Sequence, residues 1–226
     1  MRGKLIVIEG TDCCGKETQS NLLVKKFREI GIRMEHFSYP NYNSPTGKIV
    51  GGPYLGKEEI SKSFFMEGSV NVDPEIASLY YAADRKYNIH KITWLLDNEV
   101  NVIVDRYVYS NMAHQGGKLN TIEEKEHLWD YLEKLEFELL EIPKPDISIL
   151  LHMPAKCSIK LRENKVLLDE HEKSIEHLED AEKTYLELAK KYNIKVIECY
   201  NTKLRSIESI HEELFDYIKK EIQCYN

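Results

Sequence analysis

The sequence predicts one α/β domain, in which a five-stranded, mostly parallel sheet carries helices on both faces. Short apolar runs alternate with longer helical patterns along the 226 residues, and this alternation implies right-handed strand–helix–strand crossovers. The run Ile-Ser-Ile-Leu-Leu at 147–151 is apolar at nearly every position, as strands buried on both faces are. No repeat and no Pro/Gly-rich linker divides the chain, so we expect a single domain over residues 1–226.

The individual elements can be placed in chain order. Strands are expected at Leu5–Ile8, Met34–Tyr39, Val100–Val104, Ile147–Leu151 and Lys195–Cys199, and helices at Lys16–Ile30, Pro74–Asn98, Ile122–Leu140, Ser174–Tyr192 and Ser206–Ile222. Two of the helix starts carry capping signals. Asp73 before Pro74 is an N-cap with proline in the first turn, and Thr121 with Glu124 fits a capping box.

The composition limits the classes of function. A net charge of −7 with no long basic stretch argues against wrapping a nucleic-acid backbone, while a local positive pocket can still bind a small anion. The first apolar run is too short for a signal peptide or a membrane span. The five cysteines show no zinc-binding spacing, and free thiols are expected in a reducing compartment. We therefore expect a cytoplasmic protein without nucleic-acid or membrane partners.

A glycine-rich loop follows the first strand and opens the first helix. It reads Gly10-Thr11-Asp12-Cys13-Cys14-Gly15-Lys16-Glu17-Thr18, which contains the phosphate-loop pattern G-x-x-x-x-G-K in its required context. Glycine lets backbone N–H groups turn toward phosphate, and the helix N-terminus adds positive potential. Lys16 can reach the β- and γ-phosphates. The loop therefore predicts an ATP site on a three-layer fold of the P-loop NTPase type.

The loop departs from the common pattern at Glu17, which stands where Ser or Thr usually binds Mg²⁺. A carboxylate would repel triphosphate, so we expect Glu17 to face outward and a distal Asp to help hold the metal. Asp12 has two interpretations: it orients Mg²⁺ or the acceptor phosphate through water, or it makes an Asx-type turn contact. Cys13 and Cys14 are most simply small fillers.

A second polar pair, Asp105 and Arg106, follows the buried run at 102–104. Ligands of open α/β sheets bind at the carboxyl ends of the strands. Asp105 can hold Mg²⁺ through water, and Arg106 can clamp an acceptor phosphate with two hydrogen bonds. A local ion pair that closes the strand end is the structural alternative.

Around this pair the sequence resembles the thymidylate kinase family. Residues 105–116, Asp-Arg-Tyr-Val-Tyr-Ser-Asn-Met-Ala-His-Gln-Gly, are similar to its signature D-R-Y-x-x-S-x-x-A-x-Q-G. Tyr39–Tyr42 resembles its F-P-x-Y segment, Leu79–Arg85 resembles L-x-F-A-A-D-R, and 151–154 resembles the strand before its lid. The resemblance covers nearly the whole chain. It implies transfer of the γ-phosphoryl group of ATP to dTMP with Mg²⁺, typically by a homodimer, with the apolar helices at 74–98 and 122–140 as candidate interface.

The resemblance also implies roles for individual side chains. The residues implied in dTMP binding are Asp12, Tyr42, Tyr81, Arg85, Arg106, Asn111 and Gln115. Asp12 and Arg106 would position the phosphate, and Tyr81 would stack on thymine. Arg85, Asn111 and Gln115 would contact the base, while Tyr42, Tyr107 and Tyr39 would line the nucleotide pocket. Core packing explains Tyr39, Tyr80 and Tyr107 at least as well. Packing explains Arg85 less well, because a buried unpaired cation is costly. His114 stands where the family commonly carries Tyr.

The charge-rich stretch from Lys160 to Lys173 interrupts the pattern of elements. Spacing alone favours a solvated helix face, whereas the resemblance implies a short mobile lid whose cations close over phosphates. The family takes a catalytic arginine from the phosphate loop or from the lid, and no arginine lies between Gly10 and Gly15. The implied catalytic residues are Lys16, Arg106, Asp12 and Arg162, with Lys165 as the other lid candidate.

Two alternatives stay open at this point. A kinase for another nucleoside monophosphate or for a deoxynucleoside would share the phosphate loop, but a deoxynucleoside kinase needs a carboxylate near the sugar hydroxyl, and 38–42 contains no acid. A non-catalytic nucleotide-binding switch module would tolerate loss of Arg85 and Arg106. ADP formation that depends on a monophosphate separates these options.

Overall fold

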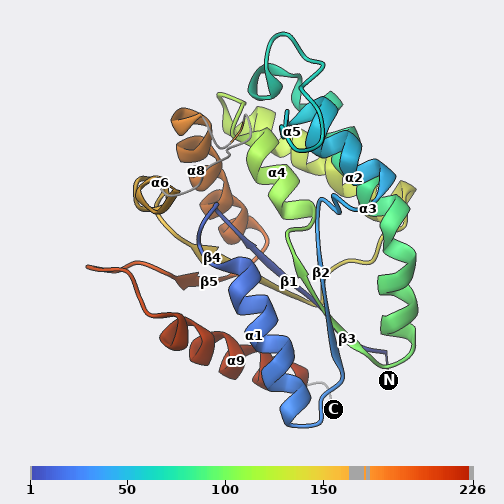
Figure 1. Ribbon diagram of the computed structural model, residues 1–226, viewed down its shortest axis with the longest axis vertical. Helices are drawn as coiled ribbons and strands as arrows, with labels where there is room; N and C mark the ends of the chain where they lie inside the picture. Colours follow the sequence, from blue (N-terminus) through green and yellow to red (C-terminus); the bar gives the residue numbers. More distant parts are fainter. Residues whose placement is uncertain (1, 163–170, 172–173, 224–226) are drawn as a thin grey trace.

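A computed structural model describes residues 2–162, 171 and 174–223 of the chain (Figure 1). Within these residues, five parallel strands form one sheet in the order β2-β3-β1-β4-β5. The strands are β1 (Leu5–Gly10), β2 (Met34–Ser38), β3 (Asn101–Asp105), β4 (Ile147–His152) and β5 (Lys195–Glu198). The predicted strands and their parallel arrangement are confirmed.

The central strand β1 supplies side chains to two separate cores. Leu5 and Val7 belong to one buried cluster, and Ile6 and Ile8 belong to the other, because successive side chains of a strand point to opposite faces of the sheet. Every residue of β1 is buried. The continuous apolar run in the sequence therefore reports a strand that is covered on both sides.

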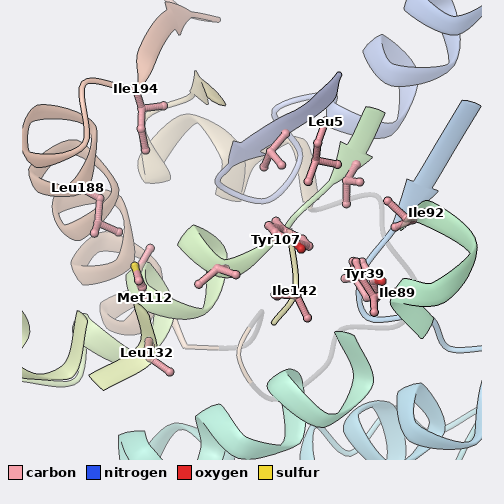
Figure 2. Close-up of a cluster of buried hydrophobic side chains, with 14 of the residues drawn as sticks. Leu5, Tyr39, Ile89, Ile92, Tyr107, Met112, Leu132, Ile142, Leu188 and Ile194 are labelled. Carbon is pink, nitrogen blue, oxygen red and sulfur yellow. The ribbon is translucent and has the colours of Figure 1, made fainter. Parts of the chain in front are cut away.

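Helices cover both faces of the sheet and complete a three-layer arrangement. On one face, α1 (Lys16–Glu29) and α9 (Ile207–Gln223) lie side by side (Figure 1) and share a core that includes Leu23 and Leu214. The other face carries α3 (Pro74–Asp97), α4 (Val108–Gly116), α5 (Ile122–Glu133) and α8 (Ile175–Lys191). Side chains such as Ile92, Met112 and Leu188 fill the core beneath them (Figure 2).

The predicted helices are all present, but the one predicted over 122–140 changes its geometry at Lys134. There α5 gives way to a π-helix, η3 (Lys134–Leu139), in which Glu136 is completely buried. Asp73 accepts hydrogen bonds from the backbone N–H groups of Glu75 and Ile76 at 2.9 and 3.1 Å, and Thr121 forms the predicted capping box. Local capping chemistry thus marks both helix starts correctly.

Several short helices were not predicted. They are α2 (Pro45–Ile49), the π-helix η1 (Val50–Tyr54), the 3₁₀-helix η2 (Ser69–Asn71), α4 and α6 (Ala155–Arg162). Segments this short do not show a clear amphipathic period. Most of the predicted lid, residues 163–170 and 172–173, lies outside the described residues. Of the helices that the structure describes, none combines the length and the apolar character needed to cross a membrane.

Candidate active site

A cavity of about 560 Å³ opens where β1, β2 and β3 end. The sheet order places β1 directly beside β3, so the loop after β1 meets the residues that follow β3, as ligand sites of open α/β sheets do. The predicted site residues in its lining are Asp12, Cys13, Gly15, Lys16, Glu17, Thr18, Tyr42, Tyr81, Arg85, Asp105, Arg106 and Asn111. The structure therefore brings the two polar constellations of the sequence into one cavity.

The backbone of the phosphate loop requires glycine at two positions, Gly10 and Gly15. A Cβ atom on Gly10 would lie 2.5 Å from the carbonyl oxygen of Leu151, and Gly15 has a positive φ of 86°. The Thr11 hydroxyl donates to the Met153 carbonyl at 2.9 Å and ties the loop to the chain after β4. Gly15 caps α1 without any side-chain hydrogen bond, which leaves the N–H groups of the helix start facing the cavity as an anion site.

Lys16 lies in the first turn of α1 and is almost completely buried. Its Nζ donates to the Thr11 carbonyl at 2.8 Å, so the side chain folds back over the loop. Glu17 and Thr18 are exposed at the same edge of the cavity. Because Glu17 is part of the cavity lining, its expected outward orientation stays a prediction.

Arg106 pairs with Asp12 across the cavity. The ion pair of Arg106 at this strand end is thus made with Asp12 of the phosphate loop, a direct contact that neither sequence interpretation of Asp12 included. Burial acts to lower the pKa of Arg106, but Asp12, Tyr185, Asp105 and Glu9 together outweigh it and raise that pKa well above its ordinary value. The Arg106 guanidinium therefore stays positively charged beside the phosphate loop. Its Nη1 also donates to the Tyr185 hydroxyl at 3.2 Å.

Glu9 holds the strand end on which Arg106 lies. Arg106 has a positive φ of 65°, a left-handed conformation that costs a residue with a side chain roughly 1–2 kcal/mol. Glu9 is completely buried, and its carboxylate accepts hydrogen bonds from the Tyr107 N–H at 3.0 Å and from the Ser110 hydroxyl. The sequence analysis missed this residue. The sequence pattern that could have indicated it is a single carboxylate near the end of an otherwise apolar strand.

Arg85 forms an ion pair with Glu136 inside the protein. Its Nη2 donates to Glu136 Oε1 at 2.5 Å, its Nε donates to Oε2, and its Nη1 donates to the Tyr107 carbonyl at 3.3 Å. Both side chains are almost fully buried. The sequence analysis found Arg85 hard to explain by packing, because a buried unpaired cation is costly. The structure supplies the missing partner, since Glu136 of the π-helix η3 pairs with Arg85. Arg85 still lines the cavity.

Comparison with known proteins identifies the family. The family model described as thymidylate kinase matches residues 8–214. The chain belongs to the thymidylate kinase family. It is 30% identical over 227 residues to a probable thymidylate kinase of Pyrococcus abyssi, covering 98% of each chain. It is 32% identical over 214 residues to one of Methanocaldococcus jannaschii, covering 95% of each.

A solved structure supports the fold. The thymidylate kinase of Candida albicans matches with a TM-score of 0.73 and 24% identity, over 97% of this chain and 92% of that one. The likeness confirms the predicted P-loop NTPase-type fold. As a member of the thymidylate kinase family, the chain is an ATP-dependent phosphotransferase that phosphorylates dTMP.

The cavity wall that carries Tyr42 is built around Asp84. This almost fully buried carboxylate accepts hydrogen bonds from the Asn41 N–H at 2.8 Å, the Ser44 hydroxyl at 3.0 Å and the Thr46 hydroxyl at 2.8 Å. It thereby fixes the loop after β2 that carries Tyr42. Asp84 stands inside the quoted segment 79–85, but its positioning role was not foreseen.

The predicted base-contacting residues differ in their placement. Tyr81 lines the cavity and meets the Tyr54 ring edge-on, with centroids 5.7 Å apart. Asn111 also lines it, and its Oδ1 has no hydrogen-bond partner among the described residues. Gln115 is completely buried outside the lining, and both of its amide atoms lack partners within the described part of the chain. Its role in base reading stays a prediction.

Core packing accounts for the other tyrosines in part. Tyr39 and Tyr107 are buried and belong to the core cluster, although both also touch the cavity. Tyr80 stacks on Tyr54 with centroids 5.8 Å apart. Arg162 is the last residue of α6, whereas its side chain and Lys165 lie outside what the structure describes.

Asp105 is the residue best placed to hold a metal beside the phosphate loop. Its Oδ1 is buried and has no hydrogen-bond partner among the described residues, and the residue lines the cavity. Carboxylate oxygens are ligands that Mg²⁺ accepts, often through water. The donor set therefore fits the metal that the sequence analysis expected.

Proposed function

We propose that this thymidylate kinase binds ATP on the phosphate loop and dTMP against α3 and α4, and transfers the γ-phosphoryl group between them with Mg²⁺. The observation that supports the proposal is one cavity lined by both Lys16 and Arg106 and by Tyr81 and Arg85. An aromatic face beside a buried cation suits a nucleobase, and two cations at a phosphate loop suit phosphates meeting end to end.

On the donor side, the proposed ATP-binding residues are those of the loop, Gly10, Thr11, Asp12, Cys13, Cys14, Gly15, Lys16, Glu17 and Thr18. The uncapped N-terminus of α1 supports this assignment, because free N–H groups and the helix dipole favour phosphate. Mg²⁺, held by Asp105 through water, would neutralise phosphate charge.

On the acceptor side, Arg106 would bind the dTMP phosphate, with Asp12 holding the guanidinium in place. Tyr81 would stack on thymine and Tyr42 would line the pocket. Arg85, Asn111 and Gln115 would contact the base edge. The unpaired Oδ1 of Asn111 supports a role as acceptor toward the thymine N3–H, since buried polar atoms without partners are uncommon.

Catalysis here requires positioning and charge more than acid–base chemistry. Lys16 and Arg106 would follow the negative charge that develops on the transferring group. Arg162 is proposed as the third cation, delivered by a lid over about 160–173 that excludes water. The start of α6 just beyond the Met153 carbonyl, to which the phosphate loop is tied, supports this placement. Replacement of Arg162 by alanine should lower kcat. An unchanged kcat would show that another residue supplies the third positive charge.

The deciding experiment is an ADP-release assay with ATP, Mg²⁺ and a panel of nucleoside monophosphates and deoxynucleosides. We expect dTMP to give the highest kcat/KM. Arg106→Ala should lower it by about 100-fold or more, while the exposed Arg33→Ala serves as control and should leave it unchanged. Faster turnover of a deoxynucleoside would favour that kinase class, and ADP formation independent of any acceptor would favour a switch module.

We also propose a homodimer formed through α3. Its exposed face carries Ile76, Leu79, Tyr87 and Trp94, which are 47–63% exposed and recur at helical spacing along one stripe. Light scattering should give twice the chain mass for the wild type and a lower mass for Trp94→Lys, but not for the control Ile30→Lys, a substitution just after α1. A monomeric wild type would reject the interface. The cytoplasmic location stays a prediction from the sequence.

A further inference from the structure

Three histidines from separate segments meet beside the candidate active site. His114 lies on α4, His177 lies on α8, and His171 lies in the segment before α8. One ring nitrogen of each lies within 4.8 Å of the others. His171 and His177 are only 5% and 6% exposed, and their ring centroids are 4.4 Å apart. The phosphoryl-transfer scheme uses none of the three side chains.

The spacing of two of the nitrogens matches that of ligands on one ion. Nδ1 of His114 and Nε2 of His177 are 3.2 Å apart. Two imidazole nitrogens bound to a tetrahedral Zn²⁺ at about 2.0–2.1 Å would be separated by about 3.3 Å. A hydrogen bond also fits this distance, but it uses the lone pair of one nitrogen only, whereas a metal ion would use both. The third nitrogen, on His171, lies within 4.8 Å of the other two, so reaching a ligand separation of about 3.3 Å would require a shift of up to about 1.5 Å.

The surroundings favour neutral imidazoles, which are the form that binds metal. Burial lowers the pKa of His114, His171 and His177 well below the ordinary value, and the neighbouring positive groups lower it further. The Tyr54 hydroxyl lies 3.2 Å from Nε2 of His171, so a polar partner can orient that ring, as partners of metal-bound histidines do.

We propose that His114, His171 and His177 form a site for one divalent transition-metal ion, best suited to Zn²⁺, with an open position toward the cavity. His114 and His171 line that cavity, so the fourth ligand would be water, hydroxide or a phosphate oxygen. Imidazole suits Zn²⁺, Co²⁺ or Ni²⁺, whereas Mg²⁺ prefers oxygen ligands. The site is therefore distinct from the proposed Mg²⁺ site at Asp105, and it does not depend on the acceptor being dTMP.

Nearby cations set the character of this site. Nη1 of Arg106 lies 3.4 Å from Nε2 of His114 and donates to it. Metal binding at Nδ1 would move the ring proton to Nε2, so this hydrogen bond would be lost when the metal binds. Lys118, whose pKa burial lowers to about 8, also faces the cluster. These charges oppose a cation, and Asp12 compensates only in part. An anionic fourth ligand would restore the balance, so we expect metal affinity to rise when inorganic phosphate is added.

The test is a Co²⁺ titration of the untagged full chain after metal removal, followed by visible absorption. We expect one Co²⁺ per chain with the intense spectrum of tetrahedral coordination, displaced by Zn²⁺ but not by excess Mg²⁺. His177→Gln should weaken binding by at least about 100-fold. The control His90→Gln, an exposed histidine of α3, should bind as the wild type does.

Three results would overturn the proposal. They are a weak octahedral spectrum only, a sulfur-to-cobalt charge-transfer band that assigns the metal to cysteine, or equal Co²⁺ affinity in a folded His177→Gln variant. Circular dichroism establishes folding first. If His177→Gln does not fold, His114→Gln and His171→Gln are titrated instead, and retained tetrahedral binding in either folded variant rejects the site.

Discussion

The buried pair between Arg85 and Glu136 offers a strong test of the described packing. In Glu136→Gln the side-chain shape is kept, but the negative charge is lost. Arg85 cannot release its proton, so it would remain charged and uncompensated in the core. Removing one partner of a buried ion pair costs about 3–5 kcal/mol. For a chain of 226 residues, each kcal/mol lowers Tm by about 2–4 °C, which gives a decrease of about 6–20 °C.

The assay is urea unfolding followed by circular dichroism at neutral pH, with Tm as a second measurement. Glu138→Gln is the matched control, because this residue lies in the same π-helix and is exposed; its unfolding free energy should change by less than about 0.5 kcal/mol. The double variant Arg85→Met with Glu136→Leu removes both charges and should recover most of the stability while weakening use of dTMP. A loss below about 1 kcal/mol in Glu136→Gln would refute a desolvated pair.

Three further predictions follow from local geometry and charge. Gly10→Ala should destabilise the protein by about 1–3 kcal/mol and raise KM for ATP, because its Cβ would lie 2.5 Å from the Leu151 carbonyl oxygen; normal thermal unfolding and KM would contradict this close approach. The pKa of His152 is raised, chiefly by its hydrogen bond with Glu182. Its stabilisation of about 0.5–1 kcal/mol should be complete below the unfolded pKa of about 6.5 and lost as pH rises through the higher folded pKa. The unfolding free energies of wild type and His152→Asn should therefore converge at alkaline pH. A difference between them that grows at alkaline pH would contradict a raised pKa of His152 in the folded protein. Asp105→Asn should raise the Mg²⁺ concentration needed for half-maximal rate, and an unchanged Mg²⁺ dependence would remove this carboxylate from the metal site.

Much of the secondary structure could be predicted because its signals act over short distances along the chain. The run at 147–151 is apolar wherever it is placed, and Asp73 and Thr121 cap their helices through N–H groups two or three residues away. The phosphate loop is equally local, since its glycines and Lys16 shape one turn. The π-helix after α5 was not predicted, and the pairing of its Glu136 with Arg85 joins residues 51 positions apart, which no local pattern can report.

The sequence by itself determined the order of strands and helices, the phosphate loop and the resemblance to thymidylate kinases, because each of these is carried by neighbouring residues. Only the tertiary structure decided the sheet order and the partners of buried polar groups. Arg85 and Glu136 are separated by 51 residues, and His114 and His177 by 63. Such pairs meet only when the helices pack against the sheet, since burial makes an unpaired polar group costly and so selects its partner across the core.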